Sequence, residues 1–569
     1  MRRQWVSGIW RAALAALLCL SPSLRAADRA PVADAAQRRD ATAIRALLKQ
    51  GADVSAAQGD GMTALHWAAQ NGDAALAKML LFAGANVRAT TRLGGYTALH
   101  LASRTGDTTL IQTLADGGAD VNARTSTGAT ALMLAAREGS LDAVKTLLDH
   151  GADPNAKESA YGETALMFAA ALDRADVVEQ LASRGADPNV ASTFIDLKSL
   201  ALPEPPTAGQ SARPAEPPPA DPKAAAKGPK PPDVAGVTRP FRYNELIGAQ
   251  GGLTPLHFAA RQGSLKSALA LLDAGANVDA ASPADRATPL LVAAINGQFD
   301  LAMRLLERGA NPNLASEAGA TPLYAALNVQ WAPKAAYPQP RAHLQQEHTY
   351  LDLMRALLDH GADPNVRINR KIWYSSYNFD QSNVDEVGAT AFWRAAYAAD
   401  VDAMRLLARS GADPNLPTTK APERRDPDSP DGGADVSGLP PLPMGGPSIT
   451  PLLAAAGPGY SKGFAGNSHH VAPGGMLAAV KFLVEECHAD VNAADAEGNT
   501  AVHNAASRGD NEMILYLVSR GANVKAVNRR GQTTVDVANG PVQRVQPFPD
   551  TIALLEKLGA KNNHKCVSC

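Results

Sequence analysis

Hydrophobic and polar positions recur along this chain with a fixed period, and each period predicts two short amphipathic helices. In one unit, Leu256, Ala259 and Ala260 fall on the same face of a predicted helix. Thr254 is a good N-cap for that helix, and Pro255 suits its first position. The small alanines allow a neighbouring helix to approach closely, so this face is predicted to be buried.

A second helix is predicted from Leu265 to Asp273, with Leu269, Leu271 and Leu272 facing the core. Gly275 supplies the left-handed residue that ends this helix, and the chain then turns through a projecting hairpin. One such unit has too little core to fold alone. It must therefore stack on its neighbours.

Two strings mark the period. The first is Gly-Ala-Asp or Gly-Ala-Asn, whose starts are 33 or 34 residues apart where the array is regular: Gly51, Gly84, Gly118, Gly151, Gly185, Gly275, Gly309, Gly361, Gly411 and Gly521. The second is Thr-Ala-Leu or Thr-Pro-Leu in phase with it: Thr63, Thr97, Thr130, Thr164, Thr254, Thr288, Thr321 and Thr450. In both strings the sequence resembles the ankyrin-repeat family. The resemblance implies an all-α repeat solenoid of about twelve helix–turn–helix units with β-hairpin fingers.

Departures from the period suggest how the chain is organised. We expect an export signal at 1–26, repeats one to five at 31–190, a Pro/Ala-rich flexible insertion at 191–250, repeats six to nine with insertions at 251–416, an insertion-rich repeat ten at 417–492, repeats eleven and twelve, with a C-terminal cap, at 493–560, and a tail at 561–569. The insertion at 191–250 either divides the array into two blocks or is a tolerated hairpin-tip insertion. The sequence leaves both open.

The first residues are typical of a bacterial export signal. Arg2 and Arg3 give a positive start, Ala12 to Leu20 is a short apolar run, and Ala26 and Ala27 offer a cleavage point. The run is too short to span a bilayer as a helix. The chain is therefore expected in the periplasm or secreted, without membrane insertion after the signal is removed.

Charge and composition narrow the partner class. The chain has 54 Lys and Arg against 56 Asp and Glu, so no overall basic excess favours nucleic acid. Aromatic residues are only 5% of the chain, yet Trp373, Tyr374, Tyr377 and Phe379 lie within seven residues. Rings on a loop held by a rigid scaffold are typical of a protein interface. The alternative is that they pack under their own insertion.

The family resemblance also implies a binding face. Ankyrin-repeat proteins typically bind partners along the concave face formed by the fingers and the first helices. By repeat position this chain places on or near that face Trp67, Arg104, Arg137, Arg261, Arg394, Tyr397 and Arg508. A row of Arg with occasional aromatics suits an acidic or mixed protein surface. The predicted function is protein–protein binding by an exported scaffold.

Histidine recurs at one repeat position, in His66, His100, His257 and His503. A metal ladder and a structural role, in which the ring ties neighbouring backbone or Thr groups, both fit that recurrence. The same position holds Met133, Met167 and Tyr324 in other repeats, which a metal site would not tolerate. The pattern therefore favours the structural role, and no metal or cofactor is expected.

A Gly-x-Ser-x-Gly string from Gly459 to Gly463 matches the nucleophile elbow of esterases. That elbow requires a strand before Ser461 and a helix after it. Here the string follows a predicted first helix and enters a glycine-rich loop. We therefore predict that the chain is not an enzyme.

The last residues contain a Cys-x-x-Cys string, Cys566 to Cys569. A Cys-x-x-Cys string that is followed by His is the attachment motif of c-type haem. Here the only nearby histidine, His564, lies before the two cysteines and not after them. Cys566 and Cys569 are therefore a possible disulfide or a vestigial haem attachment. The alternative function is the docking part of a c-type-haem electron-transfer protein truncated at its C-terminus.

Overall fold

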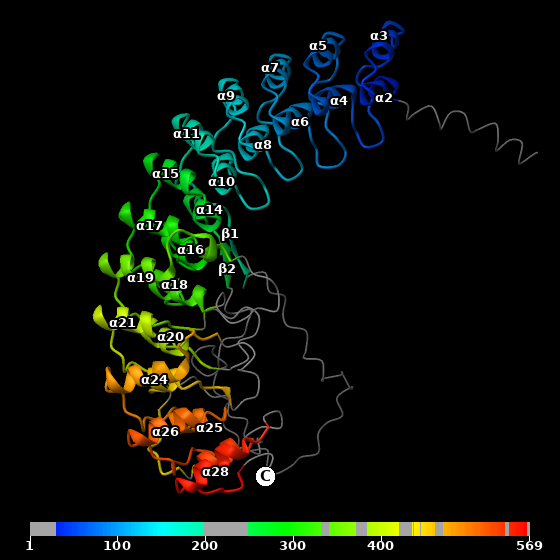
Figure 1. The fold of residues 1–569 in the computed structure, drawn as a ribbon. Helices are drawn as coiled ribbons and strands as arrows, with labels where there is room; N and C mark the ends of the chain where they lie inside the picture. The colour runs from blue at the N-terminus through cyan, green and yellow to red at the C-terminus, as the bar shows by residue number, and fades with distance from the viewer. Residues whose placement is uncertain are drawn as a thin grey trace, which may run out of the picture. The chain divides into compact units, whose positions relative to one another are not determined.

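The computed structural model describes residues 30–197, 248–331, 341–370, 372, 384–419, 435, 437–443, 445–460, 470–540 and 546–565. Within these ranges the fold is an all-α repeat solenoid in which one helix pair follows another (Figure 1). The chain divides into two compact units. Unit 1 comprises Met1–Thr193, Leu253–Ala259 and Ser264–Asn277, and unit 2 comprises Phe194–Gly252, Ala260–Gly263 and Val278–Cys569.

Unit 1 contains the regular repeats. Its helices are α2 Pro31–Gln37, α3 Ala41–Lys49, α4 Ala64–Asn71, α5 Ala74–Phe82, α6 Ala98–Thr105, α7 Thr108–Asp116, α8 Ala131–Glu138, α9 Leu141–Asp149, α10 Ala165–Ala171, α11 Ala175–Ser183 and α15 Leu265–Asp273. The first helices α2, α4, α6, α8 and α10 pack on one another in succession, and so do the second helices α5, α7, α9, α11 and α15.

Unit 2 contains the elaborated repeats and the C-terminal pair. Its elements are β1 Phe194–Asp196, β2 Ala249–Gly251, α16 Pro289–Ile295, α17 Phe299–Glu307, α18 Pro322–Gln330, the 3₁₀ helix η2 Ala342–Gln345, α19 Tyr350–Asp359, α20 Ala391–Tyr397, α21 Val401–Arg409, α22 Pro451–Ala455, α24 Gly475–Glu485, α25 Ala501–Ala506, α26 Asn511–Ser519, α27 Thr534–Ala538 and α28 Pro549–Lys557. The remaining helix, α14 Pro255–Gln262, is shared between the two units.

The core follows the predicted helical faces closely. Leu256, Ala259 and Ala260 are fully buried. Helix α15 spans the predicted residues, and Gly275 after it has φ of 88°, the left-handed conformation that ends the helix without a Cβ clash. Leu271 is fully buried, whereas Leu269 and Leu272 are only half-buried, because the second helix also faces solvent. The prediction for those two leucines was therefore too strong.

Repeat stacking in unit 1 continues across the long insertion. The backbone N–H of Ser192 donates to the carbonyl of Leu253 at 2.9 Å, which brings the flanks of the insertion together. Helix α15 packs against α11. The side-chain amide of Asn189 donates to the carbonyl of Gly275 at 3.1 Å. The boundaries between the compact units fall at both ends of the insertion, after Thr193 and before Leu253, and also inside repeat six.

The insertion is closed at its base by a small antiparallel sheet in unit 2. Strand β1 pairs with β2, with Phe194 opposite Gly251 and Asp196 opposite Ala249. The backbone N–H of Leu197 donates to the carbonyl of Gly248 at 3.0 Å, which extends the pairing by one residue on each side. The two ends of the inserted segment therefore leave the fold side by side. Among the described residues, no helix is long and apolar enough to cross a membrane.

Candidate partner-binding surface

The hairpin fingers of unit 1 are joined tip to tip by backbone hydrogen bonds. The N–H of Arg92 donates to the carbonyl of Asp60 at 2.8 Å, and the N–H of Ser126 donates to that of Gly94 at 2.9 Å. The same bond joins Ser159 to Thr127 at 2.8 Å in the next pair of fingers. Successive fingers therefore hold one another in place, and side chains at their tips are presented from a fixed backbone.

Two of these tips carry large exposed apolar side chains. Leu93 is 80% exposed and Tyr161 is 58% exposed, two repeats apart in unit 1. Exposed apolar groups on an ordered backbone are suited to contact another protein. Sequence reasoning missed both residues. The available signal was a large side chain directly before a glycine in each finger tip.

The first helices of unit 1 add a second row to this side of the molecule. The position four residues after each capping threonine holds, in successive repeats, Trp67, Leu101, Leu134 and Phe168. Leu101 is 5% exposed, and the other three are half-buried. These positions have equal register in stacked helices, so Trp67, Leu134 and Phe168 form an apolar stripe that is interrupted at the buried Leu101. Of its members, sequence reasoning named only Trp67.

Arginines border this stripe. Arg104 and Arg137 lie at equivalent positions near the ends of α6 and α8, and both are exposed. Neither forms a hydrogen bond or ion pair within the part of the chain that the structure describes. Arg261 occupies the same repeat position in α14 and is also exposed.

The indole N–H of Trp67 donates to the Gln58 side chain at 2.7 Å, so its ring is held in one orientation.

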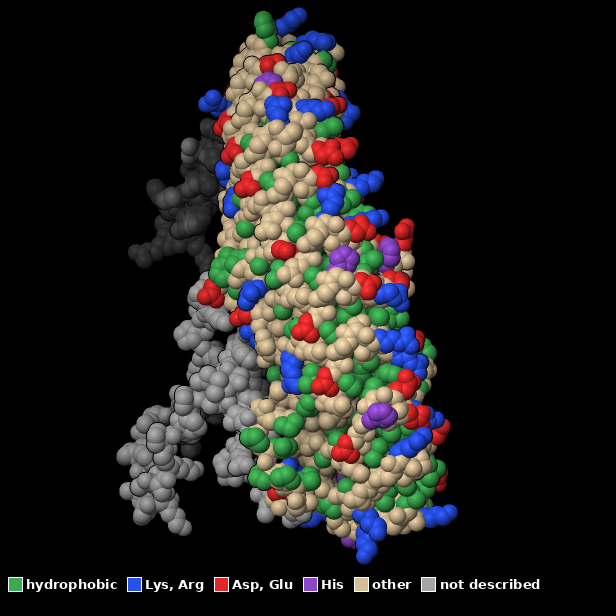
Figure 2. All heavy atoms as spheres, turned by 90° about the vertical axis from the view of Figure 1, so that its left-hand side faces the viewer, with side chains coloured by type: hydrophobic (Ala, Val, Ile, Leu, Met, Phe, Trp, Pro, Cys, Tyr) green, Lys and Arg blue, Asp and Glu red, His purple; other side chains and the backbone are tan. Residues whose placement is uncertain are grey.

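The second helices present a different surface. Figure 2 views the left-hand side of Figure 1, where second helices such as α17 and α21 lie, and it shows Lys and Arg interspersed with Asp and Glu. Many of these charges are paired: Arg184 with Asp149 at 2.5 Å in unit 1, and Arg405 with Glu486 at 2.6 Å in unit 2. Cations that already have partners are less available to another protein than Arg104 and Arg137 are.

Three of the predicted surface residues of unit 2 are not on an open surface. Arg394 is 1% exposed and Tyr397 is 3% exposed, so the prediction that they line an exposed binding face is wrong. The side chain of Arg508 is only 10% exposed, because it lies over the ring of Tyr460 and binds Asp510 at 3.1 Å. Arg394 and Tyr397 therefore lie in the interior.

The burial of Arg394 has a specific cause in repeats eight to ten. Its Nε donates to Asn328 at 2.8 Å, and its Nη2 donates to the carbonyl of Trp331 at 2.6 Å. Trp331 is itself fixed, since its indole N–H donates to Asp400 at 2.8 Å. The hydroxyl of Tyr350 donates to the same carboxylate at 2.6 Å. This buried network uses the side chains that a regular repeat would leave at the surface.

The recurring histidines are structural, as predicted. In His66, Nδ1 accepts from the backbone N–H of Thr63 at 3.2 Å, and Nε2 lies 2.9 Å from the carbonyl of Tyr96 in the following finger. His100 repeats the arrangement with Thr97. Burial lowers the pKa of both histidines, which favours the neutral ring. Within the described ranges, no three His, Cys, Asp or Glu side chains are arranged to hold a metal ion.

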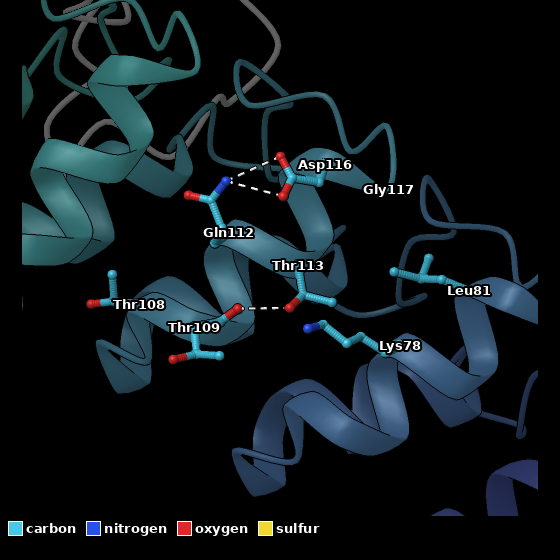
Figure 3. Close-up of a pocket in the computed structure, with 8 residues that line it drawn as sticks. All are labelled: Lys78, Leu81, Thr108, Thr109, Gln112, Thr113, Asp116 and Gly117. Atoms are coloured by element: carbon cyan, nitrogen blue, oxygen red, sulfur yellow. Dashed lines mark hydrogen bonds between the residues drawn. The ribbon is translucent and has the colours of Figure 1, made fainter.

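An open hollow of about 530 Å³ lies between α5 and α7 (Figure 3). Its lining is Lys78, Leu81, Thr108, Thr109, Gln112, Thr113, Asp116 and Gly117. The amide of Gln112 points at Asp116 and donates to both carboxylate oxygens, at 3.1 and 3.0 Å. The hydroxyl of Thr113 donates to the Thr109 carbonyl at 2.8 Å. The side chains of Gln112 and Thr113 are therefore hydrogen-bonded to other residues that line the hollow.

Several predicted residues lie outside the described part of the chain: Trp373, Tyr374, Tyr377, Phe379, Ser461, Cys566 and Cys569. Their roles stay predictions. The segment before Ser461 is described, and it contains helix α22 where a nucleophile elbow would require a strand.

Two family models match the chain. One, described as ankyrin repeats in three copies, matches residues 32–125, 68–158, 99–192 and 256–332. The other, described as ankyrin repeats in many copies, matches residues 483–538. No curated protein matches the chain.

Proposed function

The chain belongs to the ankyrin-repeat family, and from that premise we propose that it is a scaffold that binds another protein and does not catalyse a reaction. Ankyrin repeats generally mediate protein–protein interaction. A fold alone does not specify a partner, so the proposal depends on the surface of this particular chain.

The observation that carries the proposal is the first-helix and finger side of unit 1. It combines the apolar stripe of Trp67, Leu134 and Phe168 with the unpartnered cations Arg104 and Arg137. Aromatic and Arg side chains are the residue types most enriched at protein interfaces. Because the fingers are linked by backbone hydrogen bonds, little conformational freedom is lost on binding.

The chemistry of this surface indicates the kind of partner. An apolar stripe accepts apolar side chains, and flanking guanidinium groups favour carboxylates beside them. The partner we propose is therefore a protein surface with apolar residues bordered by Asp or Glu. We place the encounter outside the cytoplasm, because residues 1–26 have the pattern of an export signal. Mass spectrometry of the native chain tests this placement. A mass that lacks residues 1–26 would support export, and a mass that includes them would count against it.

A capture experiment with matched variants tests the binding surface. The variant Trp67→Ala/Arg104→Glu/Arg137→Glu changes the stripe and reverses two charges. The control Lys78→Glu/Lys145→Glu reverses two charges on second helices of the same unit. Both variants and the unchanged chain serve as bait, and captured proteins are compared by quantitative mass spectrometry.

We expect the first variant to lose about tenfold or more of its specific partners, since hot-spot residues contribute most of the binding energy. The control should retain them. Equal capture by all three baits, with circular dichroism showing all three folded, would remove this surface from consideration.

A further inference from the structure

A proline-containing segment in repeat ten lies against the fingers of repeats eleven and twelve. We call it the strap and define it as Asp435 and residues 437–443. The strap includes the sequence Leu439-Pro-Pro-Leu-Pro443. Leu439 and Leu442 are half-buried, whereas the three prolines are exposed. Residues three apart share one edge of a polyproline helix, and that spacing agrees with the burial of both leucines.

Arg529, on the finger before α27, holds the strap. Its Nη1 pairs with the Asp435 carboxylate. Its Nη2 donates to the carbonyl of Pro440 at 2.7 Å, and its Nη1 lies 3.5 Å from the carbonyl of Leu439. The Arg529 guanidinium thus contacts the Asp435 carboxylate and the carbonyl oxygens of two consecutive residues, Leu439 and Pro440. The strap turns between these groups, because Ser437 donates back to Asp435 and Gly438 has φ of 71°.

The neighbouring finger, before α25, completes the surface under the strap. We call this surface the seat and define it as Arg529 together with Ala496, Glu497 and Gly498. The Nε of Arg529 donates to the carbonyl of Ala496 at 3.2 Å, and its backbone N–H donates to that of Glu497 at 2.9 Å. Gly498 on that finger has no side chain, and a Cβ there would lie 3.1 Å from Cδ1 of Leu439. The leucine therefore packs closely on the glycine, and a side chain at 498 would also press on the backbone of Asn528 and Arg529.

We propose that Arg529 and Gly498 form a docking site for an extended peptide, and that the strap occupies this site in cis. The ligand class is a peptide with an acidic residue followed, four positions later, by Leu-Pro. The proposal names one site and one ligand chemistry for the scaffold function proposed above, and it rests on that function.

Each chemical feature of the strap matches a feature of the seat. A carboxylate pairs with a guanidinium, and two carbonyls accept its other protons. Prolines donate no N–H and reduce the backbone entropy lost on binding. Asp435 also accepts from the N–H and the hydroxyl of Ser437, at 2.9 and 2.6 Å. These bonds, followed by the ion pair with Arg529, lower the pKa of Asp435 to about 2, so it stays charged at neutral pH.

A labelled synthetic peptide with the sequence of residues 435–443 tests the site by fluorescence anisotropy with the full chain. A cis segment competes at high effective concentration, so the unchanged chain should bind the peptide weakly. The variant Asp435→Ala/Leu439→Ala weakens the strap without touching the seat and should bind the peptide about tenfold more tightly. Adding Arg529→Ala to that variant should abolish binding.

Two controls isolate the contacts that matter. Arg530→Ala removes the next cation on the same finger, which forms only a 3.8 Å ion pair with Glu497, and should leave peptide binding intact. Pro441→Ala changes an exposed strap residue and should not release the strap. Melting temperatures confirm that each variant is folded.

The proposal fails if the strap-weakened chain binds no more peptide than the unchanged chain, or if binding survives Arg529→Ala. Such a failure leaves partner capture by unit 1 unaffected, because the seat lies in unit 2 and the capture variants lie in unit 1.

Discussion

At the scale of single residues, the histidine that lies three positions after the capping threonine in some repeats shows how a repeat joins its helix to the next finger. His100 accepts from the Thr97 backbone at 3.1 Å through Nδ1, and its Nε2 lies 3.1 Å from the Ala123 carbonyl. An unprotonated Nδ1 is required, because two N–H groups cannot share that bond. Met133 preserves only the first contact, with Sδ 3.4 Å from the Thr130 nitrogen.

This geometry predicts a stability that depends on pH. Burial lowers the pKa of His66 and His100, and lowers that of His503 to about 4. In the unfolded chain a histidine takes up its proton near pH 6.5, so between these values the unfolded state holds more protons. The histidines' contribution to stability is therefore fully present above pH 6.5 and falls as the pH drops toward 4.

The variant His100→Met should lose part of that dependence. Between pH 7 and 4.5 its melting temperature should fall less than that of the unchanged chain, since each pKa unit of difference is worth about 1.4 kcal/mol. The reciprocal variant Met133→His should fall more. Carboxyl groups titrate equally in all three chains and cancel in the comparison. Parallel melting curves across the pH range would show that the ring nitrogens contribute nothing.

Offsets within one repeat predicted the histidines and the exposed Arg104 and Arg137, but not the burial of Arg394. Arg394 has the same offset from its capping threonine as Trp67. In unit 1 the side chain at that offset is half-buried in Trp67, Leu134 and Phe168, and buried in Leu101. In unit 2 the Arg394 side chain is covered because it binds Asn328 and the Trp331 carbonyl. Both of these partners lie at the end of α18, where the chain departs from the regular repeat. A residue's environment there depends on contacts with no fixed sequence spacing.

At the scale of elements, the insertion after repeat five interrupts the sequence period but not the stacking. Helix α15 packs on α11 as if the repeats were consecutive. Asn189 also accepts from the backbone N–H of Asn277 at 2.7 Å through its side-chain oxygen, the bond that links neighbouring repeats elsewhere in unit 1. The ends of the insertion are paired at Leu197 and Gly248.

This arrangement predicts that residues 198–247 are dispensable for folding. Because Leu197 and Gly248 are paired, an Asn-Gly turn can join them as a two-residue hairpin loop. Replacing the segment with Asn-Gly should keep the melting temperature or raise it slightly, since shortening a loop reduces the entropy cost of closing it. Differential scanning calorimetry of both chains makes the comparison.

A control removes the paired strands as well as the loop. Deleting residues 194–251 together with the loop eliminates β1 and β2, and this chain should be less stable than the Asn-Gly chain. If the Asn-Gly chain melts well below the unchanged protein, the inserted residues contribute to the fold and the inference from the paired ends is wrong.

The elements themselves were predictable from sequence, whereas the strap was not. Local signals placed both ends of α15 and the left-handed Gly275 correctly. The docking of Asp435 on Arg529 joins residues 94 positions apart, and nothing in the sequence near Asp435 indicates its partner. Local propensity fixes helices, but contacts between fingers arise only once the repeats are stacked.

At the scale of the whole molecule, each repeat is stabilised mainly by its two neighbours. In unit 1 the first helices meet through small side chains that are fully buried, among them Ala102, Ala135 and Ala169. Stability in such an array is approximately a sum of repeat terms and interface terms. A change in one interface should therefore weaken adjacent repeats and fade with distance along the stack.

The variant Ala135→Leu tests this coupling in full. Ala135 lies in α8, which packs against both α6 and α10, and overpacking there should cost about 1–3 kcal/mol. We expect hydrogen exchange to accelerate in α6, α8 and α10, with little change in α26 of unit 2. The control Glu138→Leu adds a leucine at an exposed position of α8 and should change exchange little. Equal acceleration throughout the chain would indicate one global cooperative unit, and acceleration confined to α8 would indicate repeats that fold independently. Either result would contradict stability that passes from neighbour to neighbour.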